Sequence, residues 1–181
     1  THRCWWVLRY AGAQDVRILN CAYDSWVKQR RPSSQKVPDI PPTRFQATPL
    51  PGWLASRDDV HAAINDPNIG LINALTREQF EGAGQHYGRP GRIPGSISVP
   101  FTAIIDPESG ALRSGPELTA ILQESGAGNF EQLITYCGGG IAASTAFLAL
   151  EVLGYTNVAL YDGSLLEWNQ DPDAPLESGA P

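Results

Sequence analysis

The sequence has little positive charge, few cysteines and no long apolar run. Its 13 Lys and Arg residues are outnumbered by 19 Asp and Glu, which gives a formal net charge of -6. This balance disfavours nucleic acid as a partner, and it means that any site for an anion must be local. No apolar stretch approaches the about 20 residues of a membrane span, so no membrane partner is expected. The 181 residues, 42% of them hydrophobic, suffice for one complete domain and at most part of another.

The three cysteines, Cys4, Cys21 and Cys137, lie far apart. Their number and spacing suit neither a disulfide framework nor a zinc site, and none of the three histidines pairs with another ligand at metal spacing. We expect no metal. Cys4 and Cys21 are expected to be small buried hydrophobic residues, whereas Cys137 stands in a context that points to reactivity.

Two stretches of the chain resemble each other at a fixed offset of 142 residues, without a gap. Each reads as the end of a helix, a Gly that stops it, a short strand, a turn and a helix that carries Trp. In the first stretch the strand begins at Val16. The matching positions are Leu8 with Leu150, Gly12 with Gly154, Val16 with Val158, and Trp26 with Trp168.

The repeat predicts the domain organisation. We expect residues 1–30 to be the C-terminal tail of a first domain, residues 31–52 to be a linker, and residues 53–181 to be a complete domain of the same kind. Proline is dense in the linker and disfavours regular structure there. The chain is therefore interpreted as part of a tandem protein, whether a fragment, a cleavage product or one piece of a nicked chain.

Strand and helix signals alternate through residues 53–181 and predict an α/β fold with a mainly parallel sheet. Helices are expected to begin after Ser56, Thr76 and Ser114, each a capping residue with an acid or amide partner three positions on. Apolar strands are expected at 69–74, 96–99, 133–136 and 158–161, and a buried helix at 143–153.

Cys137 follows one of these strands directly, and three glycines and a helix come after it. Parallel sheets place their sites at the carboxyl ends of strands. A Gly-rich loop can turn several N–H groups toward one atom, and a helix N-terminus favours negative charge, so the setting suits an anionic sulfur. A cysteine phosphatase is disfavoured because Ala143 stands where an Arg would grip phosphate, and the loop lacks the Lys and Ser or Thr of a P-loop.

Three segments in order resemble the rhodanese family. Tyr136–Ala143 resembles its active-site loop, Gly91–Pro100 its Gly-His-Ile-Pro-Gly-Ala segment, and Tyr161–Trp168 its closing Asp-Gly-Gly…Trp segment. The resemblance implies a five-stranded, mainly parallel sheet with helices on both faces. It also implies that residues 1–30 end an N-terminal, non-catalytic domain, whose missing part is then a partner, attached covalently or as a separate fragment.

The resemblance further implies an enzyme that moves sulfane sulfur from thiosulfate or 3-mercaptopyruvate to cyanide or a thiol. Cys137 would be the catalytic residue and carry the sulfur as a persulfide, with neither metal nor organic cofactor. The substrate would be bound by the loop and by two arginines of the preceding Gly-rich loop: Gly138, Gly139, Gly140, Ile141, Ala142, Arg89 and Arg92.

The sequence departs from the family at the site. Thiosulfate-type loops carry Arg or Lys after the cysteine, and 3-mercaptopyruvate-type loops carry Ser where this chain has Gly139. Asn73 and Leu75 replace a common Asp-x-Arg. A second hypothesis is therefore a rhodanese-like domain of low activity that binds a protein or relays sulfur. The cytoplasm is the expected compartment, with the periplasm left open.

Overall fold

A computed structural model describes residues 2–84 and 86–180 of the chain. Its sheet has five strands, all parallel, in the order β1-β5-β4-β2-β3. This confirms the predicted α/β fold. The strands are β1 (Leu54–Ala55), β2 (Ile69–Asn73), β3 (Ile97–Ser98), β4 (Gln132–Tyr136) and β5 (Val158–Tyr161).

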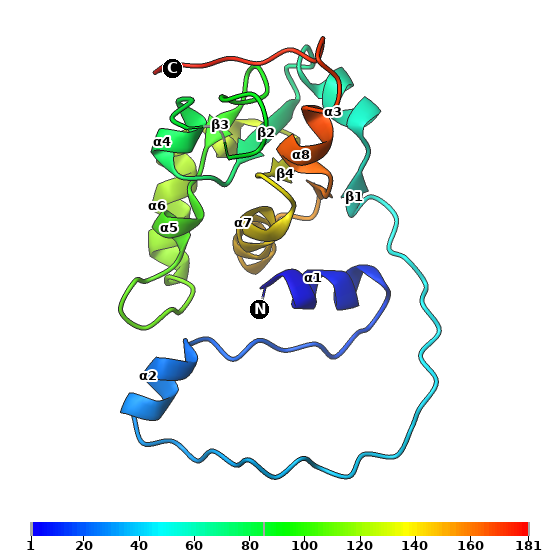
Figure 1. Cartoon of the computed structure of the whole chain (residues 1–181), viewed down its shortest axis with the longest axis vertical. Helices are drawn as coiled ribbons and strands as arrows, with labels where there is room; N and C mark the ends of the chain where they lie inside the picture. The colour runs from blue at the N-terminus through cyan, green and yellow to red at the C-terminus, as the bar shows by residue number, and fades with distance from the viewer. Residues whose placement is uncertain (1, 85, 181) are drawn as a thin grey trace.

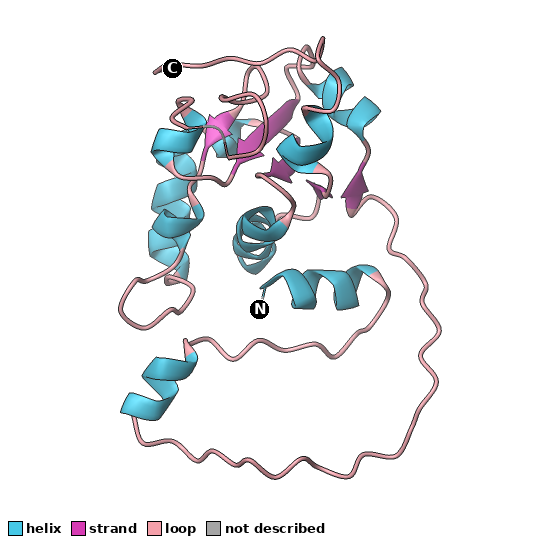
Figure 2. Ribbon diagram, in the orientation of Figure 1, coloured by secondary structure: helices cyan, strands magenta, loops and turns pink. Residues whose placement is uncertain are grey.

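Helices cover both faces of the sheet (Figures 1 and 2). α5 (Phe101–Ile104), α6 (Gly115–Ser125) and α7 (Ile141–Val152) lie together on one side, and α7 packs against β4 and β5. α3 (Arg57–Ala63) and α8 (Ser164–Trp168) lie on the other side, and α4 (Arg77–Phe80) lies beyond the end of β2. A 3-10 turn (Ala127–Asn129) precedes β4. The central β4 and its loop are therefore enclosed by helices.

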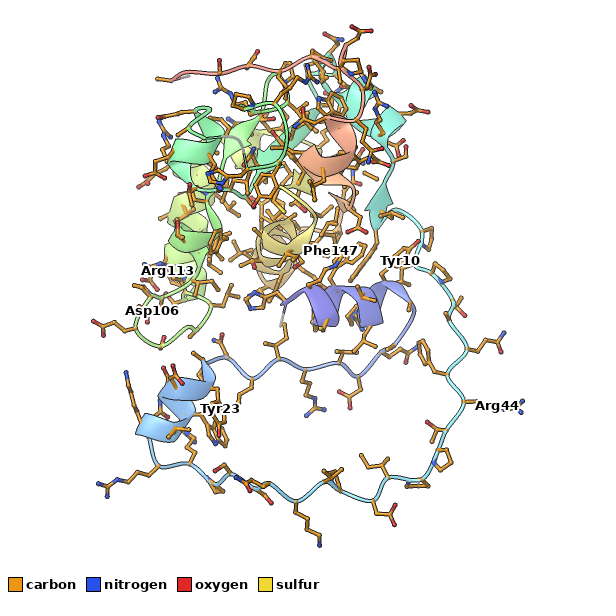
Figure 3. All side chains as sticks on the ribbon, in the orientation of Figure 1. Tyr10, Tyr23, Arg44, Asp106, Arg113 and Phe147 are labelled. Atoms are coloured by element: carbon orange, nitrogen blue, oxygen red, sulfur yellow. The ribbon has the colours of Figure 1, made fainter. Side chains whose placement is uncertain are left out.

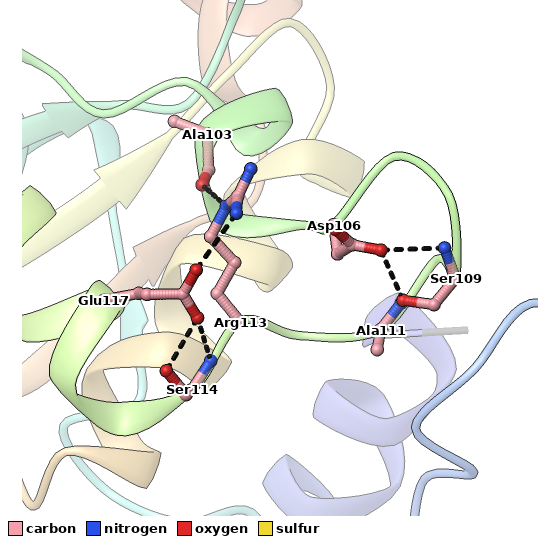
Figure 4. A network of polar contacts seen from close by, with 7 residues as sticks. All are labelled: Ala103, Asp106, Ser109, Ala111, Arg113, Ser114 and Glu117. Carbon is pink, nitrogen blue, oxygen red and sulfur yellow. Dashed lines mark hydrogen bonds and ion pairs between the residues drawn. The ribbon is translucent and has the colours of Figure 1, made fainter.

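The predicted helix starts are confirmed by three capping boxes, at Ser56, Thr76 and Ser114. Figure 4 shows the third, where the Glu117 carboxylate accepts hydrogen bonds from the Ser114 N–H and hydroxyl, at 3.0 and 2.6 Å, and pairs with Arg113. The same figure shows Asp106 closing the turn that precedes α6, through Ser109. One helix start differs, since α7 begins two residues earlier than predicted, and the predicted strands differ from β2, β3 and β4 by one residue at one or both ends.

The N-terminal segment packs on α7. In α1 (His2–Tyr10), Trp5 and Trp6 are buried, and both indoles lie against Phe147 of α7, with ring centroids 6.5 and 6.2 Å apart. Figures 1 and 3 show α1 beside α7, with Phe147 on the side of α7 that faces it. Gly12 ends this segment with φ of +97°, as its predicted role as a helix stop requires.

The strand predicted to begin at Val16 does not form. No described strand lies beside it, and an extended segment becomes a strand only by pairing. The helix predicted to carry Trp26 is present as α2 (Tyr23–Lys28), which touches the turn before α6 through the bond from the Ala22 N–H to the Ser109 carbonyl, 2.7 Å long. The division of the chain into a tail, a linker and a domain stays a prediction.

The Pro-rich linker has no helix or strand between Arg31 and Leu50 and is almost entirely exposed. It runs as a wide arc around α1 in Figure 1. The expectation that Cys4 and Cys21 are buried is wrong: Cys4 is exposed on the outer side of the short α1, and Cys21 is half-buried in an irregular segment. Among residues 2–84 and 86–180, no helix is both long and apolar enough to cross a lipid bilayer.

Candidate active site

Cys137 lies in the loop between β4 and α7, at the carboxyl end of the sheet. β4 ends at Tyr136 and α7 begins at Ile141, so the loop is Cys137 and three glycines, and Ile141 and Ala142, predicted to belong to the loop, begin the helix. Only 2% of the Cys137 surface is exposed. The residue is nevertheless part of the wall of a pocket, so its thiol can meet a small molecule without lying on the open surface.

The loop presents free hydrogen-bond donors. Among the described residues, no acceptor is found for the N–H groups of Gly138, Gly139, Ile141 or Ala142. Ile141 and Ala142 form the first turn of α7, whose N–H groups have no partner within the helix. Unpaired donors and the positive end of a helix favour an anion at this place, such as a thiolate or a persulfide.

Ser164 holds this loop in shape, and the sequence did not reveal it. Its fully buried hydroxyl accepts hydrogen bonds from the N–H groups of Cys137 and Gly140, at 3.0 and 3.2 Å, and donates to the Tyr161 carbonyl at 2.8 Å. Its φ of 49° is left-handed, which is uncommon for a residue with a side chain. Two backbone bonds, from Leu165 to Cys137 and from Leu166 to Gly138, tie the same turn to the loop.

Replacing Ser164 by alanine should destabilise the loop. The variant leaves the N–H groups of Cys137 and Gly140 buried without an acceptor, at about 1–3 kcal/mol each. Urea unfolding measures the loss. Ser164→Gly removes the same hydroxyl but relieves the left-handed backbone, so it should be less destabilised than Ser164→Ala by about 1 kcal/mol. Equal stability of Ser164→Ala and the unmodified chain would contradict this account.

Each glycine of the loop meets a different neighbour. A Cβ on Gly138 would collide with the ring of Tyr87, and one on Gly139 would lie 3.0 Å from the Leu166 Cδ1 atom. A Cβ on Gly140 would collide with the Asp162 carboxylate, and Gly140 has a left-handed φ of +76°. Gly138 and Gly140 therefore allow close approach by two other segments, at Tyr87 and Asp162, and Gly140 is needed for backbone conformation as well.

Helix α1 reaches the site. Arg3 forms an ion pair with Asp162, beside Gly140, and its guanidinium also lies over the Trp6 ring. The His2 Nδ1 atom is 2.9 Å from the Thr145 hydroxyl, which belongs to the pocket wall. Burial lowers the pKa of His2, which favours the neutral imidazole as the partner of Thr145. The N-terminal segment is thus part of the surroundings of Cys137.

The pocket beside Cys137 has a volume of about 610 Å³, within the range of small-molecule sites. Its described lining is mostly apolar and contains no charged side chain. Of the loop residues predicted to bind substrate, Gly139, Ile141 and Ala142 line it, while Gly138 and Gly140 belong to the same loop. The other lining residues are Leu75, Thr76, Gln79, Tyr87, Phe101, Thr145 and Leu166.

Asn73 and Leu75, which replace the Asp-x-Arg of the family, occupy the end of β2. The Asn73 Oδ1 atom accepts a hydrogen bond from the Leu75 N–H at 2.9 Å, and Leu75 turns an apolar side chain to the pocket. Next to Cys137, burial raises the pKa of Tyr136 to about 12. Its hydroxyl accepts from the Ile93 N–H and bonds with Ser96, so this phenol stays protonated and acts as a structural anchor.

The two arginines predicted to bind substrate point to the C-terminal segment. Arg89 donates to the carbonyls of Asp171, Pro172 and Ala174, at 2.8 to 3.0 Å. Arg92 is 5% exposed, lies over the Phe80 ring, and donates to the Gly179 carbonyl at 2.8 Å. Neither is part of the described wall of the Cys137 pocket. Their binding of substrate stays a prediction, and their contacts describe a structural role.

Comparison with known proteins agrees with this geometry. The family model described as "Rhodanese-like domain" matches residues 56–171. The chain is 33% identical over 184 residues to the "Putative thiosulfate sulfurtransferase" of Haloferax volcanii and 32% identical over 179 residues to the 3-mercaptopyruvate sulfurtransferase of Escherichia coli K12. Each match covers 97% of this chain and 64% or 63% of the relative, so the chain spans less than two thirds of their length.

Solved structures with a similar fold match nearly the whole chain. The anaerobic ergothioneine biosynthesis enzyme from Chlorobium limicola, in complex with trimethyl histidine, is 26% identical, with a TM-score of 0.86 over 99% of this chain and 45% of its own. A structure of EanB that carries a cysteine persulfide, with ergothioneine, superposes with a TM-score of 0.85 at 26% identity. The family match, the parallel sheet and the cysteine loop together establish that this chain belongs to the rhodanese-like domain family.

Proposed function

We propose that this chain is a sulfurtransferase that carries sulfane sulfur on Cys137 as a persulfide. The observation that carries the proposal is the setting of Cys137: a nearly buried residue in the wall of a pocket of about 610 Å³, in a loop where the N–H groups of Gly138 and Gly139 have no acceptor among the described residues. Relatives named as thiosulfate and 3-mercaptopyruvate sulfurtransferases support the reaction class, and a structure with a cysteine persulfide supports the intermediate.

The reaction has two steps. The Cys137 thiolate attacks the terminal sulfur of the donor, a new S–S bond forms, and the donor's bond to that sulfur breaks with the electron pair on the leaving group. The leaving group is sulfite from thiosulfate or the pyruvate enolate from 3-mercaptopyruvate. Cyanide or a thiol then attacks the outer sulfur and restores the thiolate. The free N–H groups of the loop stabilise the anionic sulfur in both steps.

A second candidate is a rhodanese-like module that relays sulfur between proteins. Leu75, in place of an arginine of the family, favours it, because the pocket then offers no cation to a small anionic donor. A relative from Thermus thermophilus, 29% identical, is named sulfur carrier protein TtuD. Such a module would use the same Cys137 persulfide but would receive or deliver sulfur at a docked partner.

Intact mass spectrometry without reductant tests the proposal. After treatment with thiosulfate or 3-mercaptopyruvate, the chain should gain one sulfur, which cyanide removes. The Cys137→Ser variant, with Cys4 and Cys21 in place, should gain none. If neither donor adds sulfur while Cys137 still reacts with a neutral alkylating reagent, an enzyme that uses thiosulfate or 3-mercaptopyruvate is excluded and the relay module is favoured. Sulfur found on Cys137→Ser would exclude Cys137 as the carrier.

A further inference from the structure

The wall around Cys137 lacks the charge that a small dianion requires. Its described residues include two aromatic rings, Tyr87 and Phe101, and no cation. The guanidinium of Arg3, which lies beside Gly140, is paired with Asp162. Arg89 and Arg92 are engaged by carbonyls of the C-terminal segment. A dianion that left water for this pocket would lose hydration without gaining an ion pair, which is unfavourable.

Tyr87 explains why no cation follows Cys137 in the sequence. The backbone of Gly138 is not left-handed, so it would accept a side chain; what forbids one is the Tyr87 ring, whose Cε1 and Cζ atoms fill the place of a Cβ. Asn169 restrains the backbone that carries this ring, since its Nδ2 group donates to the backbone carbonyls of Tyr87 and Arg89 at 2.7 and 3.2 Å. The aromatic ring and a side chain at residue 138 exclude each other.

We propose that Tyr87 determines the donor specificity of this site: by occupying the side-chain position of residue 138, it selects an organic sulfur donor with an apolar group over inorganic thiosulfate. The apolar group would lie against Tyr87 and Phe101, while the anionic sulfur lies at the loop N–H groups. This inference rests on the proposed function and names the substrate class for the same thiol.

Two sulfur donors that react by the same chemistry but differ in charge, thiosulfate and benzenethiosulfonate, test this specificity. Benzenethiosulfonate differs from thiosulfate by a phenyl group in place of one anionic oxygen. With either donor, the Cys137 thiolate takes the terminal sulfur, and the electron pair of the broken S–S bond leaves on benzenesulfinate or on sulfite. No oxidant or reductant is needed. Dividing each rate by that of the same donor with free cysteine removes the difference in intrinsic reactivity.

The unmodified chain should prefer benzenethiosulfonate by about tenfold or more in normalised single-turnover rate, measured as mass gain. The double variant Tyr87→Ala/Gly138→Arg frees the space and adds a guanidinium, so its thiosulfate rate should rise about tenfold or more and the preference should fall. Gly138→Arg alone should be slower with both donors, because the two side chains compete. Tyr87→Phe, which keeps the ring, should keep the preference.

Alkylation of Cys137 by a neutral reagent, together with far-UV circular dichroism, establishes that each variant is folded with its thiol accessible. Equal normalised rates for the two donors in the unmodified chain would overturn the inference. A folded double variant whose normalised rate with thiosulfate is no higher than that of the unmodified chain would overturn the inference as well. Absence of loading by both donors in the unmodified chain would instead contradict the proposed persulfide chemistry, and the inference would fall with it.

Discussion

Gly140→Ala is expected to lower the free energy of unfolding by about 2–5 kcal/mol, from left-handed backbone strain and overpacking together. Gly140 has φ of +76°, and an added Cβ would collide with the Asp162 carboxylate and lie 3.0 Å from its carbonyl oxygen and from the Arg3 guanidinium. The backbone oxygen cannot move aside without shifting the turn that carries Ser164. The same change should therefore slow alkylation of Cys137 or sulfur loading, because the N–H groups of the loop would be turned from their places.

Two other glycines provide matched controls, all compared by urea unfolding. Gly154 has φ of +86° but nothing within 4 Å of its Cβ position, so Gly154→Ala measures left-handed strain alone, about 1–2 kcal/mol. The Cβ atom added by Gly139→Ala would meet only the end of the Leu166 side chain, so this variant should lose less free energy of unfolding than Gly140→Ala. If Gly140→Ala is no less stable than Gly154→Ala, the contact with Asp162 does not restrain the loop.

Trp168→Ala is expected to cost about 3–5 kcal/mol of stability, as for other large aromatic residues removed from a core. Trp168 is fully buried, its indole N–H donates to the Pro175 carbonyl at 3.0 Å, and its ring lies 4.4 Å from that of His61. The side chain thus joins α8 to α3 and to the C-terminal segment. Chemical denaturation followed by circular dichroism measures the loss.

The repeat predicted from the sequence supplies the control for this prediction. Trp26 aligns with Trp168, and its indole N–H likewise donates to a proline carbonyl, that of Pro32, at 3.0 Å. Trp26 is only half-buried, with Arg31 over its ring, so Trp26→Ala should cost about 1 kcal/mol or less. If Trp26→Ala loses as much stability as Trp168→Ala, α2 is held by contacts other than those described.

Much of the fold could be predicted because residues 53–181 follow local sequence rules for caps and strands. Capping boxes predict α3, α4 and α6, and apolar runs predict β2, β4 and β5. The strand expected at Val16 failed because a strand depends on a neighbour, which a local pattern does not reveal. The exposure of Cys4 was missed because its burial depends on which side of α1 packs against α7, a matter of tertiary contact.

At the site, the position of Cys137 could be predicted, but its partners could not. The strand, the Gly-rich loop and the helix follow one another in the sequence, and together they put the Cys137 thiol at the carboxyl end of the sheet. Ser164 and Tyr87 act across 27 and 51 residues of sequence, on Cys137 and Gly138 respectively, and no spacing rule connects them. The substrate role predicted for Arg89 and Arg92 depends on the resemblance to the family, and in the structure both donate to backbone carbonyls of the C-terminal segment.

Because α1 packs on α7, one side of the site depends on an intact linker between α1 and the rest of the chain. The linker is exposed and lacks helix or strand, so it acts as a tether that raises the effective concentration of α1 near α7. Trp5 and Trp6 lie outside the matched residues 56–171, yet they cover Phe147, and Arg3 and His2 extend to the Cys137 loop and pocket. Were the tether cut, this side of the site would be held by a bimolecular equilibrium, and its integrity would then vary with dilution.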